Sequence, residues 1–211
     1  MSDWFGSVAE KLGEIPVSAW ISVAALIILG ALILIMRKKS FSARLLSIGA
    51  LCVAASFLLS YIPLFKMPYG GTVTPASMLP IIAYGFAFGP AAGISAGIVY
   101  GCLQMLQGVY FVHPVQFLLD YILPFALLGV SGFFNKKYFL LAILTSGFSR
   151  FLMHYLSGVV FWGSYAPEGQ PVWLYSLIYN GSYMLPEAIL CMALGAIPGV
   201  RKALLSMGSK R

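Results

Sequence analysis

Long apolar runs separated by short polar stretches make up most of the chain, and they predict membrane-spanning helices. A helix needs roughly 17–25 mostly apolar residues to cross a bilayer. Seven runs meet or approach that length, and two of them are short and joined at Gly89-Pro90. We place the spans at about 17–36, 43–62, 76–89, 90–107, 115–133, 138–160 and 173–198. The pattern therefore predicts an all-α, polytopic membrane helical bundle.

Composition supports a membrane protein rather than a soluble one. The 211 residues are 60% hydrophobic and 9% charged, whereas soluble domains carry about 25% charged residues. The net charge of +7 therefore does not indicate nucleic-acid binding. The three cysteines lie singly in apolar runs, without the spacing of a metal site, so we interpret them as packing residues.

The basic residues predict how the chain is oriented in the membrane. The cluster Arg37-Lys38-Lys39 follows the first apolar run, whereas a secretory signal carries its positive charge before that run. We therefore expect an uncleaved anchor with its N-terminus outside. Placing the cluster inside makes ten of the thirteen basic residues cytoplasmic, as the positive-inside rule requires. The C-terminus is then cytoplasmic as well.

Small residues recur at four-residue spacing in two spans, which lets helix backbones approach closely. In the span 90–107 and at its start they are Gly89, Gly93, Gly97 and Gly101. We interpret these glycines as internal packing. Ala50 and Ala54 form a second small-residue face. It either packs internally or docks a second membrane protein.

Three spans carry polar residues at helical spacing, so each set lies on one helix face. The sets are Gln116 and Asp120; Ser146, Arg150, His154 and Ser157; and Ser176, Asn180, Tyr183 and Glu187. Lipid penalises such groups, so these faces are expected to turn inward. At a rise of about 1.5 Å per residue, Asp120, His154 and Asn180 lie roughly 8–10 Å below the outer ends of their spans. The three side chains therefore belong to one layer.

Two interpretations of this layer stay open. In the first, the aromatic residues form an interfacial belt and the polar groups bond to one another. In the second, Asp120 and the surrounding rings bind a small, ring-bearing cation, because carboxylates and aromatic faces both attract positive charge. Tyr121 adjoins the acid, and the outer rim holds Tyr69, Tyr110, Phe161, Trp162, Tyr165 and Trp173.

Arg150 and Glu187 lie deeper than this layer. We expect them to pair with each other or with backbone carbonyls, and a structural ion pair is the favoured interpretation. His113-Pro114 stands at a junction between loop and helix, where capping is a better explanation than ligand binding.

Known catalytic motifs are missing from the sequence. It contains no G-x-x-x-x-G-K-[ST] phosphate loop, no H-E-x-x-H zinc motif and no G-x-S-x-G elbow. We therefore expect a binding protein rather than an enzyme, with neither a cofactor nor a metal. Two alternatives are a self-sufficient secondary transporter and an intramembrane enzyme that uses His154 with Asp120.

Three strings resemble a known family. They are YFVHPVQFLLDY (110–121), RFLMHYLSGVVFWGSY (150–165) and WLYSLIYNGSYMLPE (173–187). They are similar to the thiamine-specific S components of energy-coupling factor (ECF) vitamin transporters. The resemblance implies a six-span domain that binds thiamine at the outer side and works with a coupling transmembrane protein and two ATPase subunits. Residues 41–211 would form that domain, and residues 1–40 would form an extracellular flank and one extra helix. The nearest alternative is an S component for riboflavin or for a thiamine precursor.

The resemblance also implies roles for five residues around the acid. Asp120 stands where many members have a glutamate that contacts the cationic thiazolium. Tyr121 and Tyr110 would line the same end of the site. His154 would contact the aminopyrimidine ring, and Trp162 would stack on it.

Further roles follow from the same resemblance. Tyr175 and Asn180 would supply hydrogen bonds to the substrate. Arg150 matches a basic family position and would orient the hydroxyethyl end or a phosphate. Tyr69 stands in the first outer loop, where some members use a tryptophan lid. Ala50-x-x-x-Ala54 resembles the small-residue motif with which S components dock on the coupling protein.

Overall fold

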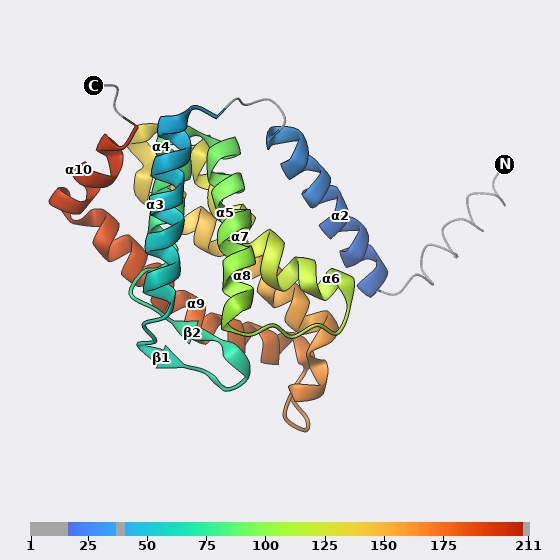
Figure 1. Cartoon of the computed structure of the whole chain (residues 1–211). Helices are drawn as coiled ribbons and strands as arrows, with labels where there is room; N and C mark the ends of the chain where they lie inside the picture. The colour runs from blue at the N-terminus through green and yellow to red at the C-terminus, as the bar shows by residue number, and fades with distance from the viewer. Residues whose placement is uncertain (1–16, 37–40, 209–211) are drawn as a thin grey trace, which may run out of the picture.

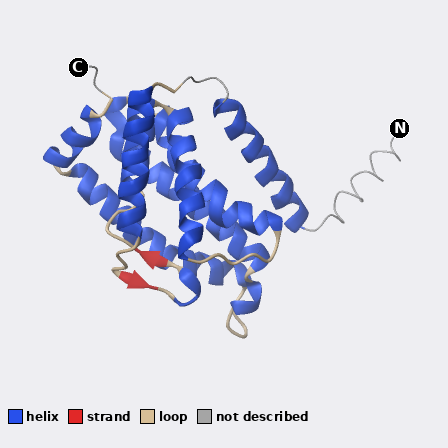
Figure 2. Cartoon of the chain, viewed as in Figure 1, coloured by secondary structure: helices blue, strands red, loops and turns tan. Residues whose placement is uncertain are grey.

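The computed structural model describes residues 17–36 and 41–208, and almost all of the described chain is helical (Figures 1 and 2). The predicted all-α bundle is confirmed. Residues 1–16, 37–40 and 209–211 lie outside the described part. The acidic N-terminal flank and the cluster Arg37-Lys38-Lys39, on which the predicted orientation depends, therefore lie outside it too.

The described residues of the first half form four helices and a small hairpin. The helices are α2 (Val17–Met36), α3 (Ala43–Ser60), α4 (Leu79–Phe88) and α5 (Pro90–Gln104). Between α3 and α4, the strands β1 (Phe65–Lys66) and β2 (Thr72–Val73) pair in antiparallel fashion around the short turn η1 (Pro68–Gly70). Figure 1 places this hairpin at the opposite end of the molecule from the start of α3.

The second half alternates short, irregular segments with two long helices. After η2 (Met105–Gln107), one irregular span is built from α6 (Pro114–Phe117), η3 (Leu118–Ile122), α7 (Leu123–Ala126) and η4 (Leu127–Phe133). The rest of the chain comprises η5 (Lys136–Tyr138), α8 (Phe139–Phe161), η6 (Gly163–Tyr165), α9 (Val172–Ala196) and α10 (Pro198–Ser206).

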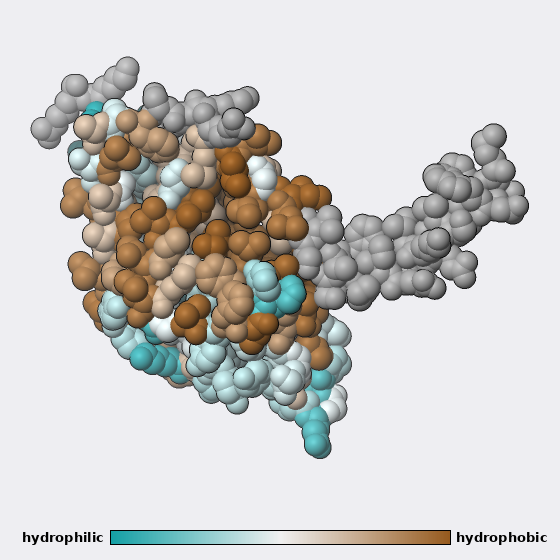
Figure 3. All heavy atoms as spheres, turned by 45° about the vertical axis from the view of Figure 1, so that its right-hand side comes forward, coloured by the Kyte–Doolittle hydropathy of each residue, from teal (hydrophilic) through white to brown (hydrophobic). Residues whose placement is uncertain are grey.

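Within the described residues, four helical stretches are long and apolar enough to cross a membrane. They are Ala43–Ser60, Pro114–Phe133, Lys136–Phe161 and Val172–Ala196, and Ala24–Met36 and Leu79–Phe88 are shorter apolar helices. On the face shown in Figure 3, hydrophobic side chains cover the middle, and hydrophilic ones gather at the lower end, where Figure 1 places the hairpin. The chain is a membrane protein.

The ends of the predicted spans differ from the structure by up to three residues, and two of these shifts have a local cause. The span expected at 76–89 contains only the ten-residue helix α4, because Thr74 to Met78 form a tight turn with Ala76 at a φ of 60°. The last span was expected to reach residue 198 but ends at Ala196. Ile197 is extended (φ −64°, ψ 120°), as residues before proline commonly are.

The glycines of α5 bring three segments into close contact at the centre of the bundle. A Cβ added at Gly97 would collide with the carbonyl group of Phe125, and one at Gly93 would collide with Gly85 and Gly129. The predicted role of these glycines in internal packing is confirmed. Their packing also holds the irregular span 114–133 against α5.

The extra helix α2 packs on the outside of this span. Ala25 and Leu32 are buried and belong to one apolar cluster with Val115 and Leu119. Leu26, Ile27, Ile33 and Leu34 on the same helix remain exposed. Helix α2 therefore packs mainly against α5, with smaller contacts to α7 and α8, and lies at one side of the bundle in Figure 1.

Candidate functional site

Asp120 lies in η3, a π-helical segment between α6 and α7. The N–H group of Leu123 donates to the carbonyl of Leu118, five residues back, instead of four as in an α-helix. Pro124 follows, and because proline has no N–H group it cannot continue the α-helical ladder. Such π segments occur frequently at functional sites.

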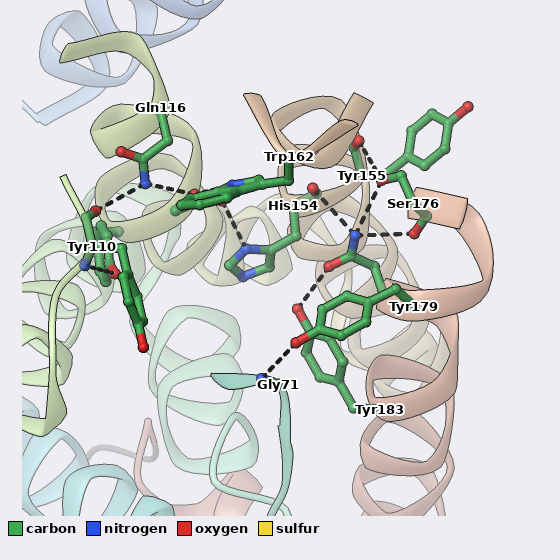
Figure 4. Close-up of polar contacts among 12 residues, drawn as sticks. Gly71, Tyr110, Gln116, His154, Tyr155, Trp162, Ser176, Tyr179 and Tyr183 are labelled. Atoms are coloured by element: carbon green, nitrogen blue, oxygen red, sulfur yellow. Dashed lines mark hydrogen bonds and ion pairs between the residues drawn. The ribbon is translucent and has the colours of Figure 1, made fainter. Parts of the chain in front are cut away.

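Three side chains surround the carboxylate of Asp120. Gln116 Nε2 donates to Oδ2 at 2.7 Å, and Trp162 Nε1 donates to the same oxygen at 3.2 Å. His154 Nδ1 lies 3.4 Å from Oδ1. In Figure 4, the side chains of Gln116, Trp162 and His154 converge from two elements. In the part of the chain that the structure describes, Asp120 forms no ion pair with a lysine or arginine.

A row of aromatic rings extends from Asp120 toward the hairpin and the loop before α9. The ring of Trp162 lies edge-on to Tyr110, with centroids 6.4 Å apart, and 5.9 Å from Tyr165. Tyr165 in turn lies 4.5 Å from Tyr69. Tyr69, the predicted lid residue, is 66% exposed and reaches Trp162 only through Tyr165.

A second row of aromatic rings follows one face of α9. Tyr175 and Tyr179 are stacked with centroids 5.9 Å apart, and Tyr183 lies 5.9 Å further on. The ring of Tyr183 is 6.4 Å from His154. Among the described ring contacts, Tyr175 is therefore linked to His154 through Tyr179 and Tyr183.

Asn180 joins the two long helices. Its Nδ2 atom donates to the Ser176 carbonyl oxygen at 3.0 Å and to the His154 carbonyl oxygen at 3.4 Å, while its Oδ1 accepts from the Tyr183 hydroxyl at 2.9 Å (Figure 4). The predicted layer of Asp120, His154 and Asn180 is therefore present. Tyr121 connects the loop before α6 to this cluster, because its hydroxyl accepts from the Tyr110 N–H at 2.9 Å.

The expected ion pair between Arg150 and Glu187 is wrong. The guanidinium carbon of Arg150 lies 4.6 Å from the centroid of the Phe125 ring, because Arg150 faces α7. Among the described residues, Arg150 Nε and His154 Nε2 are buried without a hydrogen-bond partner. Two buried polar atoms one helical turn apart on α8 therefore have unused hydrogen-bonding capacity.

Glu187 instead anchors the loop that follows the hairpin. Its carboxylate accepts from the Thr74 N–H at 2.6 Å, the Thr74 hydroxyl at 2.7 Å and the Ser77 hydroxyl at 3.2 Å. Nearer the hairpin tip, Tyr179 accepts from the Gly71 N–H at 3.1 Å and donates to the Pro68 carbonyl. The segment 67–77 between α3 and α4 is therefore fastened to α9 at two points.

Replacing Glu187 with alanine should destabilise the protein. Hydrogen bonds to a charged group contribute about 1.5–3 kcal/mol each, and Glu187→Ala removes the acceptor of three donors. We expect the apparent melting temperature in detergent to fall by about 5 °C or more. Glu168→Ala, at an exposed acid in the loop before α9, is the matched control. Equal melting temperatures for the two variants would show that the anchor is unimportant.

Sequence reasoning missed two of these functions. Tyr179 was given no role in the sequence analysis, and neither was Gln116, although Gln116 is fully buried beside Asp120. The spacing of Gln116 and Asp120, one helical turn apart, was the available signal.

The predicted capping role of His113 is confirmed, since its Nδ1 accepts from the Val115 N–H at 3.1 Å. Within the described ranges, no group of three or more His, Cys, Asp or Glu side chains could hold a metal.

Ala50 and Ala54 lie away from this polar cluster, in an apolar groove between α3 and α5. Both alanines are exposed, and the groove has a volume of about 450 Å³. Its walls include Val53 and Phe57 from α3 and Ala96 and Val99 from α5, and Tyr84 from α4 also lines it. The two alanines therefore do not pack internally.

Comparisons with known proteins agree with this architecture. Residues 46–205 match the family model described as "Thiamine transporter protein (Thia_YuaJ)". The "Thiamine transporter ThiT" of Bacillus subtilis is 38% identical over 173 residues, which cover 74% of this chain and 90% of the relative. The protein of the same name from Lacticaseibacillus paracasei is 31% identical, covering 67% and 79%. A solved structure of ThiT from Listeria monocytogenes has a TM-score of 0.66 and 26% identity, and covers 76% of this chain and 96% of that one.

Proposed function

Because the chain belongs to the thiamine transporter (Thia_YuaJ) family, we propose that it is a membrane-embedded thiamine-binding subunit. In this proposal it mediates ATP-dependent thiamine uptake together with a separate ECF module, made of a coupling transmembrane protein and two ATPase subunits. The absence of a phosphate loop from the sequence supports that division of labour. Residues 41–211 form the binding domain, with the N-terminus outside and the C-terminus cytoplasmic.

The observation that carries the proposal is the environment of Asp120. Its carboxylate is held by Gln116, Trp162 and His154 and has no lysine or arginine ion-pair partner among the described residues. These partners hold the carboxylate in place, and a cationic ligand would supply the opposite charge. Aromatic faces beside it add about 0.5–2 kcal/mol each by cation–π contact.

Within this proposal, the two ends of thiamine take different partners. The positively charged thiazolium lies against Asp120, and Tyr110 and Tyr121 line that end. The aminopyrimidine stacks on Trp162 and bonds to His154, whose Nε2 has no partner among the described side chains.

The remaining proposed contacts surround the substrate. Asn180 and Tyr175 contribute from α9, and Arg150, whose Nε is unpartnered within the described chain, binds the hydroxyethyl end or a phosphate on it. Tyr69 closes the site from the hairpin side.

A titration of the purified protein tests the proposal. Thiamine added in detergent is expected to change the intrinsic tryptophan fluorescence, because Trp162 lies in the site. Competition against riboflavin and an aminopyrimidine precursor separates thiamine from the alternative ligands, and native mass spectrometry identifies a vitamin that copurifies. Binding of another vitamin without binding of thiamine would refute the ligand. Uptake into proteoliposomes without ATPase subunits would instead favour a secondary transporter.

A further inference from the structure

Gln116 is fully buried. Both N–H groups of its side-chain amide and one of the two lone pairs of its carbonyl oxygen form hydrogen bonds. Its Oε1 accepts from the Val112 N–H at 3.1 Å. Its Nε2 donates to the Tyr110 carbonyl oxygen at 3.1 Å and to Asp120 Oδ2 at 2.7 Å. An N–H group can only donate and a carbonyl can only accept, so these partners fix the orientation of the amide.

This amide joins the two walls of the candidate site. Asp120 supplies the negative charge, and the ring of Tyr110 lies edge-on to Trp162 on the other side. Because Gln116 binds both the carboxylate and the backbone of Tyr110 (Figure 4), it sets their separation. No other side chain bonds to both within the described ranges.

The charge of the donor matters as much as its position. A lysine at this position would serve the same two acceptors, but its positive charge would cancel that of the carboxylate at short range. Among the described residues, neither Arg150 nor Glu187 pairs with Asp120: Arg150 lies over Phe125, and Glu187 binds the loop after the hairpin. His154 Nδ1 lies 3.4 Å from Asp120 Oδ1 and carries a charge only when the ring is protonated. Neutrality of the residue at position 116 therefore decides whether Asp120 remains available to a cation.

We propose that Gln116 is a specificity-determining positioning residue, which holds Asp120 and the Tyr110 loop through an uncharged amide and so reserves the carboxylate for a cationic substrate. This inference rests on the proposed function, because it assigns the preference for a cation to one residue of the same site. Gln116 acts through Asp120 and does not itself contact the charged ring of the ligand.

The test compares a cation with a neutral molecule of the same shape. The probes are thiamine and its thiophene analogue, in which a carbon atom replaces the charged thiazolium nitrogen. We expect the wild-type protein to prefer thiamine. Gln116→Lys should weaken thiamine binding by at least about tenfold, the equivalent of about 1.4 kcal/mol. It should leave the affinity for the neutral analogue within about threefold, the equivalent of less than about 0.7 kcal/mol, because that analogue carries no charge for the lysine to repel.

A matched control separates this effect from added positive charge in general. Gln107 is an exposed glutamine in η2 whose Nε2 donates to Ser60 at 2.6 Å, outside the Asp120 cluster. Gln107→Lys should leave both affinities unchanged. If Gln116→Lys kept the wild-type preference for thiamine, the inference would be overturned.

If Gln116→Lys does not fold, a double-mutant cycle tests whether Gln116 acts through Asp120. Gln116→Met removes the donor without adding charge, so it should weaken thiamine binding by about tenfold in the native background and by less than about twofold beside Asp120→Asn. Equal losses in the two backgrounds would show that Gln116 does not act through Asp120. A wild-type protein that binds no thiamine would instead refute the proposed function itself.

Discussion

Replacing Asp120 with alanine is expected to weaken thiamine binding by at least about tenfold, a loss of about 1.4 kcal/mol or more. The substitution removes the negative charge that opposes the thiazolium. It also leaves the donors of Gln116 and Trp162 without their acceptor, and a buried donor that loses its partner costs about 1–3 kcal/mol. Titration of purified protein by tryptophan fluorescence measures the change.

Two further variants show whether the lost charge of Asp120 causes that loss of affinity. Asp120→Asn keeps the shape of the side chain but not its charge, so it should reproduce most of the effect if electrostatic attraction is the cause. Glu168→Ala removes an exposed acid from the loop before α9 and should leave the affinity unchanged. Wild-type affinity in both Asp120 variants would remove this residue from the site.

Placing tryptophan at Ala54 should abolish thiamine uptake while leaving thiamine binding intact. Ala54 is exposed and lines the apolar groove between α3 and α5. An indole ring there would fill the space in which, under the proposed function, the coupling protein docks. The groove does not include Asp120 or its partners, so the binding site should stay unchanged. Uptake is measured in cells that contain the complete transporter, and binding is measured on the purified subunit.

Leu51→Trp is the matched control for the docking experiment. Leu51 lies on the same helix and is 71% exposed, but it is not among the residues that line the groove. It should therefore accept a tryptophan without loss of uptake. Ala50→Trp, on the groove side, should behave like Ala54→Trp. Normal uptake by the Ala50 and Ala54 variants would rule out the groove as the docking surface.

Spacing along the helices was enough to predict the central layer of the site. Asp120, His154 and Asn180 come from three different spans, yet their distances from the outer ends of those spans placed them at one depth. The structure brings His154 into contact with both of the others. This prediction succeeded because helical rise relates residue number directly to depth.

Contacts made by the loops could not be predicted in the same way. Glu187 and Thr74 are 113 residues apart, and the tight turn at Ala76 leaves no periodic pattern. Because the sequence does not reveal that turn, Arg150 was the most obvious partner for the buried carboxylate of Glu187. The π-helical segment was also missed, because hydrophobic periodicity cannot reveal one additional residue in a helical turn.

The additional residue in the π-helical turn Leu118–Ile122 rotates one half of the span 114–133 about the helix axis relative to the other half. Upstream, Gln116 and Asp120 face the polar cluster; downstream, Phe125 and Gly129 face the glycines of α5. An α-helical residue contributes about 100° of turn, so deleting one residue here would swing one half away from its partners. Chain length across Leu118–Ile122 is consequently under tighter constraint than the identity of the apolar side chains within it.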